Sequence, residues 1–206
     1  VIVASGARPR KLGLGLEDEL RGKGVSYCAT CDGNFFRGKT VAVVGGGNTA
    51  VADALYLSRI CEKVYLIHRR DTLRATQVYN LRLAETENIE VLWNTEVKRL
   101  LADNGRLAGI KVENKVAGQS MDLPCQGLFI AVGNVPNTEF LGSALQLDEG
   151  GYIEADESGR TNIPGVYAVG DVRTKMLRQV TTAVADGSLA AEFAAEYLAL
   201  EGSATL

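Results

Sequence analysis

The feature that most constrains the fold of this chain is a strand, turn, helix and strand built around three consecutive glycines. Apolar and β-branched residues fill Thr40–Val44, the glycines follow at Gly45–Gly47, and a helix is expected from Asn48 to Ile60. A second apolar run, Val64–Ile67, completes the segment. Two buried strands joined by a helix of this length predict a parallel βαβ unit, so we expect an α/β fold.

The glycine turn is typical of a dinucleotide site. Gly45 permits a tight turn, Gly47 allows the backbone to approach a pyrophosphate, and Ala50 is small enough for the helix to lie close to the sheet. The helix that begins at Asn48 and Thr49 would direct its free N–H groups at phosphate. Glycines that serve packing alone are the alternative, but the presence of both flanking elements favours nucleotide binding.

Positive side chains follow the second strand of this unit. An NAD site usually places an acidic residue roughly 20 positions beyond the glycines, where it binds the ribose 2′-hydroxyl. This chain instead has His68, Arg69 and Arg70, with Arg74 one helical turn further on. Guanidinium groups offer paired donors to a 2′-phosphate, so the pattern favours NADPH. A solvated surface cluster with a structural histidine is the alternative.

A Cys-x-x-Cys motif lies upstream of the turn. Its spacing suits a redox disulfide, half of a zinc site or a structural bridge, and Asp32 after Cys31 excludes the haem attachment pattern. Zinc would need two more ligands at suitable spacing, whereas Cys61 and Cys125 are far from each other and are expected to be small buried residues. We therefore predict no metal site. Asp32 could protonate the thiolate that leaves when a Cys28–Cys31 disulfide opens, or could simply be a turn residue.

Composition sets broad limits on function. The 206 residues are 46% apolar, which is enough for one large or two small domains. The net charge of −3 argues against a nucleic-acid partner. Neither a membrane span nor a signal peptide is expected, and the cysteine usage fits the cytoplasm.

Further elements are expected along the rest of the chain. The first residues, Val1–Gly6, read as a strand already under way, so we expect the chain to be part of a longer polypeptide. Elsewhere the sequence predicts helices over 71–85 and 180–198, strands at 89–93, 127–133 and 166–169, and a hairpin whose turn is Asn104–Gly105.

Taken together, the motifs resemble those of the low-molecular-weight, flavin-dependent thioredoxin reductases, over the later two-thirds of that family's sequence. The matching segments are 28–33, 45–50, 68–71, 165–172 and 178–179. The resemblance implies a Rossmann-like NADPH domain inserted in an incomplete FAD domain, as in the two-dinucleotide-binding flavoproteins. It places a remnant of the FAD domain at 1–9, the NADPH domain at 10–133 and the rest of the FAD domain at 134–206.

The resemblance also implies a mechanism. NADPH bound at the glycine turn and the His68–Arg74 cluster would pass hydride to FAD, and the reduced flavin would open the Cys28–Cys31 disulfide. The dithiol would then reduce thioredoxin, with Asp32 as the acid. Asp171 matches a contact to the ribityl chain of FAD, and Arg178 and Gln179 match positions beside the flavin. The full-length enzyme is expected to be a homodimer whose two domains rotate about hinges near 8–10 and 133–134.

One departure from the family concerns FAD. The glycine-rich turn that opens the family's FAD domain is not in this sequence, so we expect the chain itself to bind FAD poorly. Two alternatives to a thioredoxin reductase stay open. One is a flavoprotein disulfide reductase of a peroxidase system, and the other is a non-enzymatic NADPH-binding module.

Overall fold

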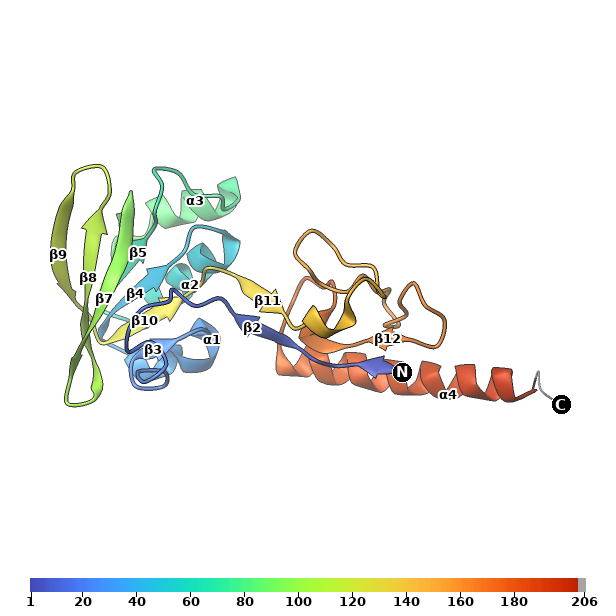
Figure 1. The fold of residues 1–206 in the computed structure, drawn as a ribbon. Helices are drawn as coiled ribbons and strands as arrows, with labels where there is room; N and C mark the ends of the chain where they lie inside the picture. Colours follow the sequence, from blue (N-terminus) through green and yellow to red (C-terminus); the bar gives the residue numbers. More distant parts are fainter. Residues whose placement is uncertain (204–206) are drawn as a thin grey trace. The chain divides into compact units, whose positions relative to one another are not determined.

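A computed structural model describes residues 1–203, and in it the chain divides into two compact units (Figure 1). One unit is the continuous stretch Lys11–Gly133. The other combines Val1–Arg10 with the segment that begins at Asn134. The two ends of the chain therefore build one unit together, and the middle of the chain builds the other.

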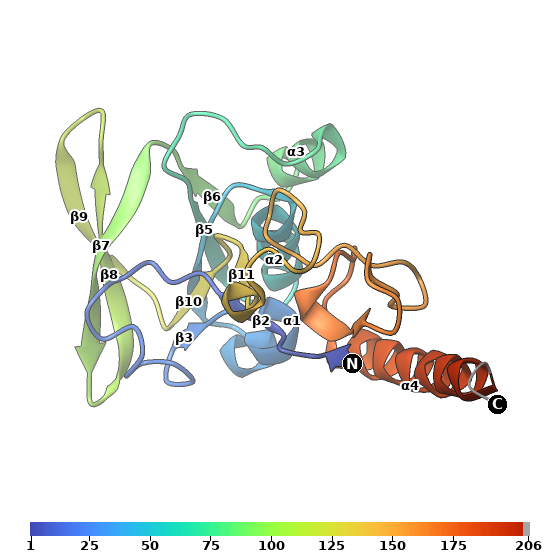
Figure 2. The same ribbon diagram turned by 45° about the vertical axis from the view of Figure 1, so that its right-hand side comes forward.

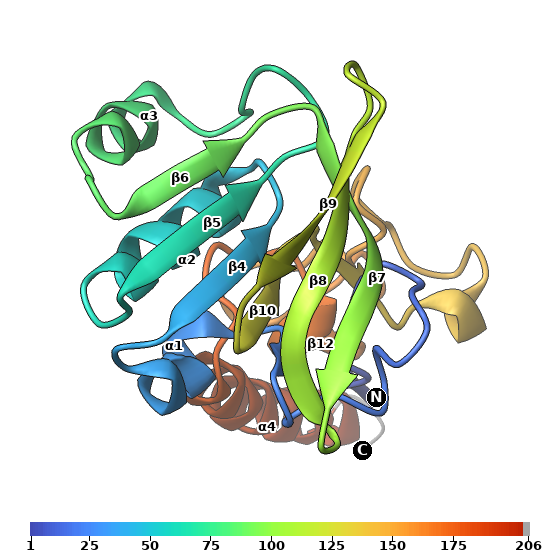
Figure 3. The same ribbon diagram turned by 90° about the vertical axis from the view of Figure 1, so that its left-hand side faces the viewer.

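The continuous unit is organised around a five-stranded parallel sheet, seen face-on in Figure 3. Its strands, in spatial order, are β3 (Val25–Ser26), β10 (Gly127–Ile130), β4 (Thr40–Val44), β5 (Lys63–Ile67) and β6 (Ile89–Leu92). All four neighbouring pairs run parallel. Both faces of the sheet are covered, which is why its central strands read as continuous apolar runs rather than alternating ones.

Helices cover one face of this sheet (Figure 2). They are α1 (Ala29–Asp32), the 3₁₀ helix η1 (Gly33–Phe36), α2 (Asn48–Ser58) and α3 (Gln77–Ala84). Val41 and Val43 of β4 pack with Val51 and Leu57 of α2 in one buried cluster. The βαβ unit of β4, α2 and β5 expected from the sequence is thus confirmed.

An antiparallel sheet covers the other face. It consists of β7 (Thr95–Asp103), β8 (Arg106–Asn114) and β9 (Gln119–Pro124). Residues of the parallel sheet that point away from the helices, such as Ala42 and Leu128, pack against Ile110 of β8. The predicted Asn104–Gly105 turn is confirmed, and both residues have the positive φ angles, 49° and 72°, that such a two-residue turn needs.

Two expectations for this unit differ from the structure. The helix expected over 71–85 begins later, at Gln77, because the preceding loop hydrogen-bonds to the glycine turn instead of coiling. Strand β9 was not anticipated at all. Four of its first five residues are polar or exposed, so the sequence carries little of the apolar pattern by which a strand is recognised.

The other unit is smaller and has less regular structure. Strand β1 (Ile2–Val3) pairs in parallel with β12 (Tyr167–Ala168), and β2 (Ala7–Pro9) pairs antiparallel with β11 (Asn134–Pro136). Two 3₁₀ helices, η2 (Glu139–Leu141) and η3 (Gly170–Val172), and the long helix α4 (Val180–Ser203) complete it. Ala190 of α4 packs against β12 in a small buried cluster. Among the described residues, none of the helices combines the length and the apolar character that crossing a bilayer requires.

Candidate functional site

The glycine turn lies between the end of β4 and the start of α2, at the carboxyl edge of the parallel sheet. Gly45 has φ +155°, and a Cβ there would lie 2.4 Å from the Ala131 carbonyl oxygen and 2.6 Å from Cβ of Ala50. The absence of a side chain is therefore what lets α2 begin so close to β10. Ligands of open parallel sheets bind at this edge, where free N–H groups of a helix also point outward.

Gly47 differs from the other two glycines of the turn. It is the N-cap of α2, and a Cβ built on it would meet nothing within 4 Å. Its backbone therefore faces open space, as the backbone beside a bound pyrophosphate must. Asn48 and Thr49 are exposed beside it, whereas Ala50 is fully buried and contributes only close packing.

The loop before α3 is attached to this turn by two hydrogen bonds. The Arg74 N–H donates to the Gly46 carbonyl oxygen at 2.7 Å, and the Thr76 N–H donates to Oδ1 of Asn48 at 2.8 Å. The Asn48 side chain thus holds the loop in place. As a result, the backbone of Arg74 lies directly beside the proposed phosphate site.

Three arginines surround this edge of the sheet. Arg69, Arg70 and Arg74 are exposed, and within residues 1–203 none of them takes part in an ion pair. The backbone that carries them is fixed, since the Asn94 N–H donates to the Arg70 carbonyl oxygen at 3.0 Å. Guanidinium groups without an ion-pair partner are suited to a phosphate monoester, so these three are candidates for binding one.

His68 is separated from these arginines by its burial. It is 6% exposed, and its Nε2 lies 2.9 Å from the Thr72 carbonyl oxygen. Burial lowers its pKa, and the charges of Arg70 and Arg74 act in the same direction, against backbone hydrogen bonds to Thr72 and Gly45. The ring is therefore neutral at neutral pH and adds no charge for a phosphate. The sequence grouped His68 with the arginines, but the structure places it beneath the turn.

The ring of His68 also explains why the middle residue of the turn is glycine. A Cβ at Gly46 would lie 2.1 Å from Cε1 of His68, which is closer than any real contact. His68 thus supports the turn from below, and Gly46 provides the room that its ring occupies.

The Cys-x-x-Cys motif forms a disulfide at the start of α1. Cys28 and Cys31 are bonded, with their Cα atoms 5.3 Å apart. Cys28 is the N-cap of α1, and its Sγ accepts a hydrogen bond from the Cys31 N–H at 3.2 Å. Cys31 is exposed and Cys28 is half-buried, so a reaction partner has access to the pair. An exposed disulfide in a short helix has the arrangement that thiol–disulfide exchange needs.

The helix of the dithiol packs on the helix of the glycine turn. Immediately after Asp32, a Cβ at Gly33 would lie 2.9 Å from the Tyr56 ring and 3.0 Å from Leu57, both on α2. Ala29 of α1 belongs to the same buried cluster as α2. The disulfide and the proposed nucleotide site therefore lie in one compact unit.

Asp32 is held by a residue that sequence reasoning missed. The Ser26 hydroxyl donates to Oδ2 of Asp32 at 2.6 Å and accepts from the Cys28 N–H at 3.1 Å. A serine two residues before a Cys-x-x-Cys-Asp motif is the only sequence signal, and it is too common a residue to be noticed without the structure.

The two other cysteines are buried, as expected, and do not take part in a disulfide. Burial raises the pKa of Cys61 to about 11 and that of Cys125 to about 12. Their thiols therefore stay protonated at neutral pH and are poor nucleophiles. Within residues 1–203, no group of histidine, cysteine and carboxylate side chains has the arrangement of a metal site.

The residues expected beside the flavin lie in the other unit. Asp171 is in η3, and its Oδ1 is buried without a hydrogen-bond partner. Nε of Arg178 donates to the Asp171 carbonyl oxygen at 3.4 Å, and its guanidinium lies 3.9 Å from the centre of the Tyr152 ring. Gln179 is exposed just before α4. A buried, unpaired carboxylate oxygen fits an acceptor for a ligand hydroxyl, because leaving it unsatisfied costs free energy.

A second missed residue, Asp186, fixes this turn. Its carboxylate accepts hydrogen bonds from the Gly170 N–H, from Nε and Nη2 of Arg173, and from Nζ of Lys175. Burial alone would raise the pKa of Asp186, but these hydrogen bonds outweigh it and hold the pKa at about 2. Asp186 therefore binds the backbone N–H of Gly170 before Asp171 and the side chains of Arg173 and Lys175 after it. In the sequence, the only indication of this role is that Asp186 is an acidic residue in an otherwise alanine-rich helix.

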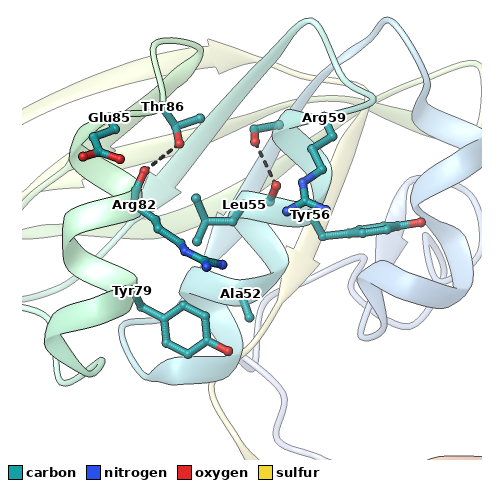
Figure 4. A pocket seen from close by; sticks show the side chains of 9 residues that line it. Ala52, Leu55, Tyr56, Arg59, Tyr79, Arg82, Glu85 and Thr86 are labelled. Atoms are coloured by element: carbon teal, nitrogen blue, oxygen red, sulfur yellow. Dashed lines mark hydrogen bonds between the residues drawn. The ribbon is translucent and has the colours of Figure 1, made fainter.

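A surface groove of the continuous unit lies away from these residues. It encloses about 590 Å³ between α2 and α3. In Figure 4 the Arg82 side chain extends from α3 toward α2, beside the Tyr79 ring. The lining residues are Ala52, Leu55, Tyr56, Ser58, Arg59, Tyr79, Arg82, Glu85 and Thr86. None of them belongs to the glycine turn, the arginine cluster or the dithiol.

A sequence profile of the pyridine nucleotide-disulphide oxidoreductases matches residues 1–187. The chain belongs to this family. It is 47% identical over 199 residues to a thioredoxin reductase of Listeria monocytogenes serovar 1/2a, and 41% identical over 198 residues to that of Bacillus subtilis strain 168. Each match covers 96% of this chain. The chain spans 62% of the Listeria relative and 63% of the Bacillus relative.

Solved structures agree with this membership. The chain is similar to thioredoxin reductase from Streptococcus pyogenes MGAS5005, with 42% identity and a TM-score of 0.88, over 96% of this chain and 65% of that one. The Giardia duodenalis thioredoxin reductase gives 36% identity, the same TM-score and the same two coverages. The expected resemblance to thioredoxin reductases is confirmed, as is the expected fold class of a two-dinucleotide-binding flavoprotein.

Alanine substitutions at two adjacent glycines should separate support of the turn from ligand contact. Gly47→Ala should change the free energy of unfolding by less than about 0.5 kcal/mol, because its Cβ meets nothing, yet should weaken NADPH binding about tenfold by blocking the pyrophosphate. Gly46→Ala should destabilise the chain by about 2 kcal/mol, because its Cβ meets the His68 ring. Urea unfolding and calorimetric titration of the 206-residue chain measure both effects. Unchanged NADPH affinity in Gly47→Ala would contradict the proposed pyrophosphate site.

Proposed function

We propose that the protein to which this chain belongs reduces the disulfide of thioredoxin at the expense of NADPH. The observation that carries the proposal is an accessible disulfide at the start of α1, a helix that packs on α2, the helix that follows the glycine turn. The similarity to thioredoxin reductases supports it. Because the chain spans about three-fifths of those relatives, the activity is proposed for the whole protein.

The NADPH site is proposed at the glycine turn. Gly47, Asn48 and Thr49 would present their backbone to the pyrophosphate, while Gly45 and Ala50 would provide the close packing that makes room for it. Arg69, Arg70 and Arg74 would bind the 2′-phosphate, with His68 supporting the turn. Bound there, NADPH would supply the hydride for the reaction.

The FAD site is proposed at η3 and the start of α4. The unpaired Oδ1 of Asp171 would accept a hydrogen bond from a ribityl hydroxyl, and Arg178 and Gln179 would lie beside the flavin. FAD would carry the electrons from nicotinamide to disulfide in the full-length protein. In this proposal residues 10–133 are the NADPH domain, and 1–9 with 134–206 are parts of the FAD domain.

The chemistry of the dithiol follows from thiol–disulfide exchange. A Cys28 or Cys31 thiolate attacks the partner's disulfide, a mixed disulfide forms, and the second cysteine releases the partner as a dithiol. A sulfur leaves more readily when an acid donates a proton to it as the S–S bond breaks. We assign this role to Asp32.

The proposed partner is thioredoxin or a thioredoxin-like protein. Phe35, four residues after Cys31, is 75% exposed, while the neighbouring Phe36 is buried against Phe129. An exposed aromatic ring close in sequence to an accessible disulfide suits a protein substrate, because aromatic side chains are enriched in protein–protein interfaces. We further propose that the full-length protein is a homodimer and acts in the cytoplasm, where reducing conditions keep dithiols available.

The second candidate function is a flavoprotein disulfide reductase of a peroxidase system, which would use the same dithiol and the same NADPH site. A flavin-free NADPH-binding module is the third, and it would leave the disulfide without an electron source. The unpaired Asp171 oxygen favours the two flavin-containing alternatives over the module.

Removing two guanidinium groups should change nucleotide preference. The double variant Arg69→Ala with Arg70→Ala should weaken NADPH binding about 100-fold and NADH binding less than about threefold, because only NADPH carries the 2′-phosphate. Calorimetric titration of the chain with each nucleotide makes the comparison. Equal losses for NADPH and NADH would refute the 2′-phosphate role of these arginines.

Removing one sulfur should abolish turnover without weakening nucleotide binding. In the full-length protein, Cys31→Ser should reduce NADPH-dependent thioredoxin reduction by at least about 1,000-fold, because no intramolecular disulfide can form. NADPH affinity should stay within about twofold, because Cys31 lies outside the glycine turn. Insulin-coupled turnover and nucleotide titration provide the two measurements. Retained turnover would end the dithiol hypothesis.

A further inference from the structure

The Ser26 hydroxyl hydrogen-bonds both to Asp32 and to the backbone of Cys28, the first cysteine of the dithiol. Its Oγ is 2.6 Å from Oδ2 of Asp32, 3.1 Å from the Cys28 nitrogen and 3.3 Å from the Cys28 carbonyl oxygen. Ser26 is 4% exposed, so little water competes for these contacts. One buried hydroxyl therefore touches the proposed acid and both backbone polar groups of the first cysteine.

These three contacts match the hydrogen-bonding capacity of a hydroxyl in both protonation states of Asp32. A hydroxyl donates once and accepts twice. When the carboxylate is ionised, Ser26 donates to Asp32 and accepts from the Cys28 N–H. When Asp32 is protonated, its O–H donates to Ser26, and the serine proton turns to the Cys28 carbonyl oxygen. In either state Ser26 therefore keeps a hydrogen bond to Asp32 and at least one to the backbone of Cys28.

We propose that Ser26 is a positioning residue for proton transfer in disulfide exchange, holding the Asp32 carboxyl beside the Cys28–Cys31 pair whether or not it carries a proton. The inference rests on the proposed role of Asp32 as the acid. It assigns to Ser26 no contact with the reacting sulfur atoms.

The fold keeps Ser26 in place. It lies on β3, where it pairs with the buried Phe129 of β10. On the other side, the Asp32 N–H donates to the Cys28 carbonyl oxygen at 3.1 Å, which ties the acid to the first cysteine across one helical turn. The Asp32 carboxyl, which would exchange the proton, is thus attached through Ser26 to strand β3 and through its own backbone to α1. These two attachments limit its movement.

The proton step can be written in full for reduction of the pair by an external dithiol. A thiolate of the reductant bonds to one sulfur while the Cys28–Cys31 bond breaks, and the electron pair leaves with the other sulfur. That sulfur takes the proton of the Asp32 carboxyl. The second thiol of the reductant then attacks its own bonded sulfur, closes the reductant's disulfide and releases the remaining cysteine, which takes the proton that this second thiol loses. The pair thus gains two electrons and two protons, one from Asp32 and one from the reductant.

The test uses the 206-residue chain with dithiothreitol as the reductant, without nucleotide or flavin. The rate of disulfide opening is followed by quenching with iodoacetamide and counting alkylated cysteines by mass. Wild type is compared with Ser26→Ala, Asp32→Asn and the double variant. Ser26→Thr and Ser26→Val form a matched pair, because they add the same bulk at the buried site and differ in the hydroxyl.

Ser26→Ala should slow opening of the disulfide about tenfold. This loss is part of the rate acceleration that a positioned acid provides. In the Asp32→Asn background it should have less than about a twofold further effect, because Ser26 acts only through the acid. Ser26→Thr should open at least about five times faster than Ser26→Val. If Ser26 had a purely structural role, Ser26→Ala would slow opening equally in the wild-type and Asp32→Asn proteins. The Ser26→Thr and Ser26→Val variants would then open at the same rate.

Three results would overturn the inference: an equal slowing by Ser26→Ala in both backgrounds, equal rates for the threonine and valine variants, or an Asp32→Asn variant that opens as fast as wild type. Because the assay contains neither NADPH nor thioredoxin, these results are independent of the proposed reductase activity. That activity would fail separately, through absence of NADPH-dependent turnover in the full-length protein.

Discussion

The structure of the continuous unit depends on one close contact, the approach of the first turn of α2 to the end of β10. Gly45 makes it possible, because any side chain there would overlap the Ala131 carbonyl oxygen and Cβ of Ala50. With that contact made, the helix begins directly at the carboxyl edge of the parallel sheet. Its N–H groups then point into the space where dinucleotides bind in folds of this kind. The same helix supports α1, so the position of the disulfide depends on this contact too.

The charged and polar groups around the turn divide into those that make contacts within the protein and those that stay exposed. His68, Asn48 and the backbone of Arg74 are used within the protein, through the contact under Gly46 and two hydrogen bonds. The guanidinium groups of Arg69, Arg70 and Arg74 are left exposed. A similar division holds near the disulfide, where the buried Ser26 hydroxyl hydrogen-bonds to the more accessible Asp32. In the proposed mechanism, a buried neutral group at each place would fix the geometry of a more accessible one.

The sequence was most informative where a local rule applies. The glycine turn, the helix that follows and the Asn104–Gly105 hairpin each have a short signature with a steric reason, and each is confirmed in the structure. It was least informative where an element depends on distant partners. The start of α3 is set by hydrogen bonds from its preceding loop to the glycine turn, and β9 is held by pairing with β8 rather than by its own pattern. Ser26 and Asp186 were missed for the same reason, since their roles come from tertiary contacts.

The central claim is that the glycine turn and the arginines beside it form one nucleotide site. Titration of the ¹⁵N-labelled chain with NADP⁺, followed by amide chemical shifts, tests it most directly. The account predicts the largest shifts at Gly46–Ala50 and Arg69–Arg74, with NAD⁺ affecting the first group but not the second. Shifts centred instead on the groove between α2 and α3, or identical responses to the two nucleotides, would contradict it.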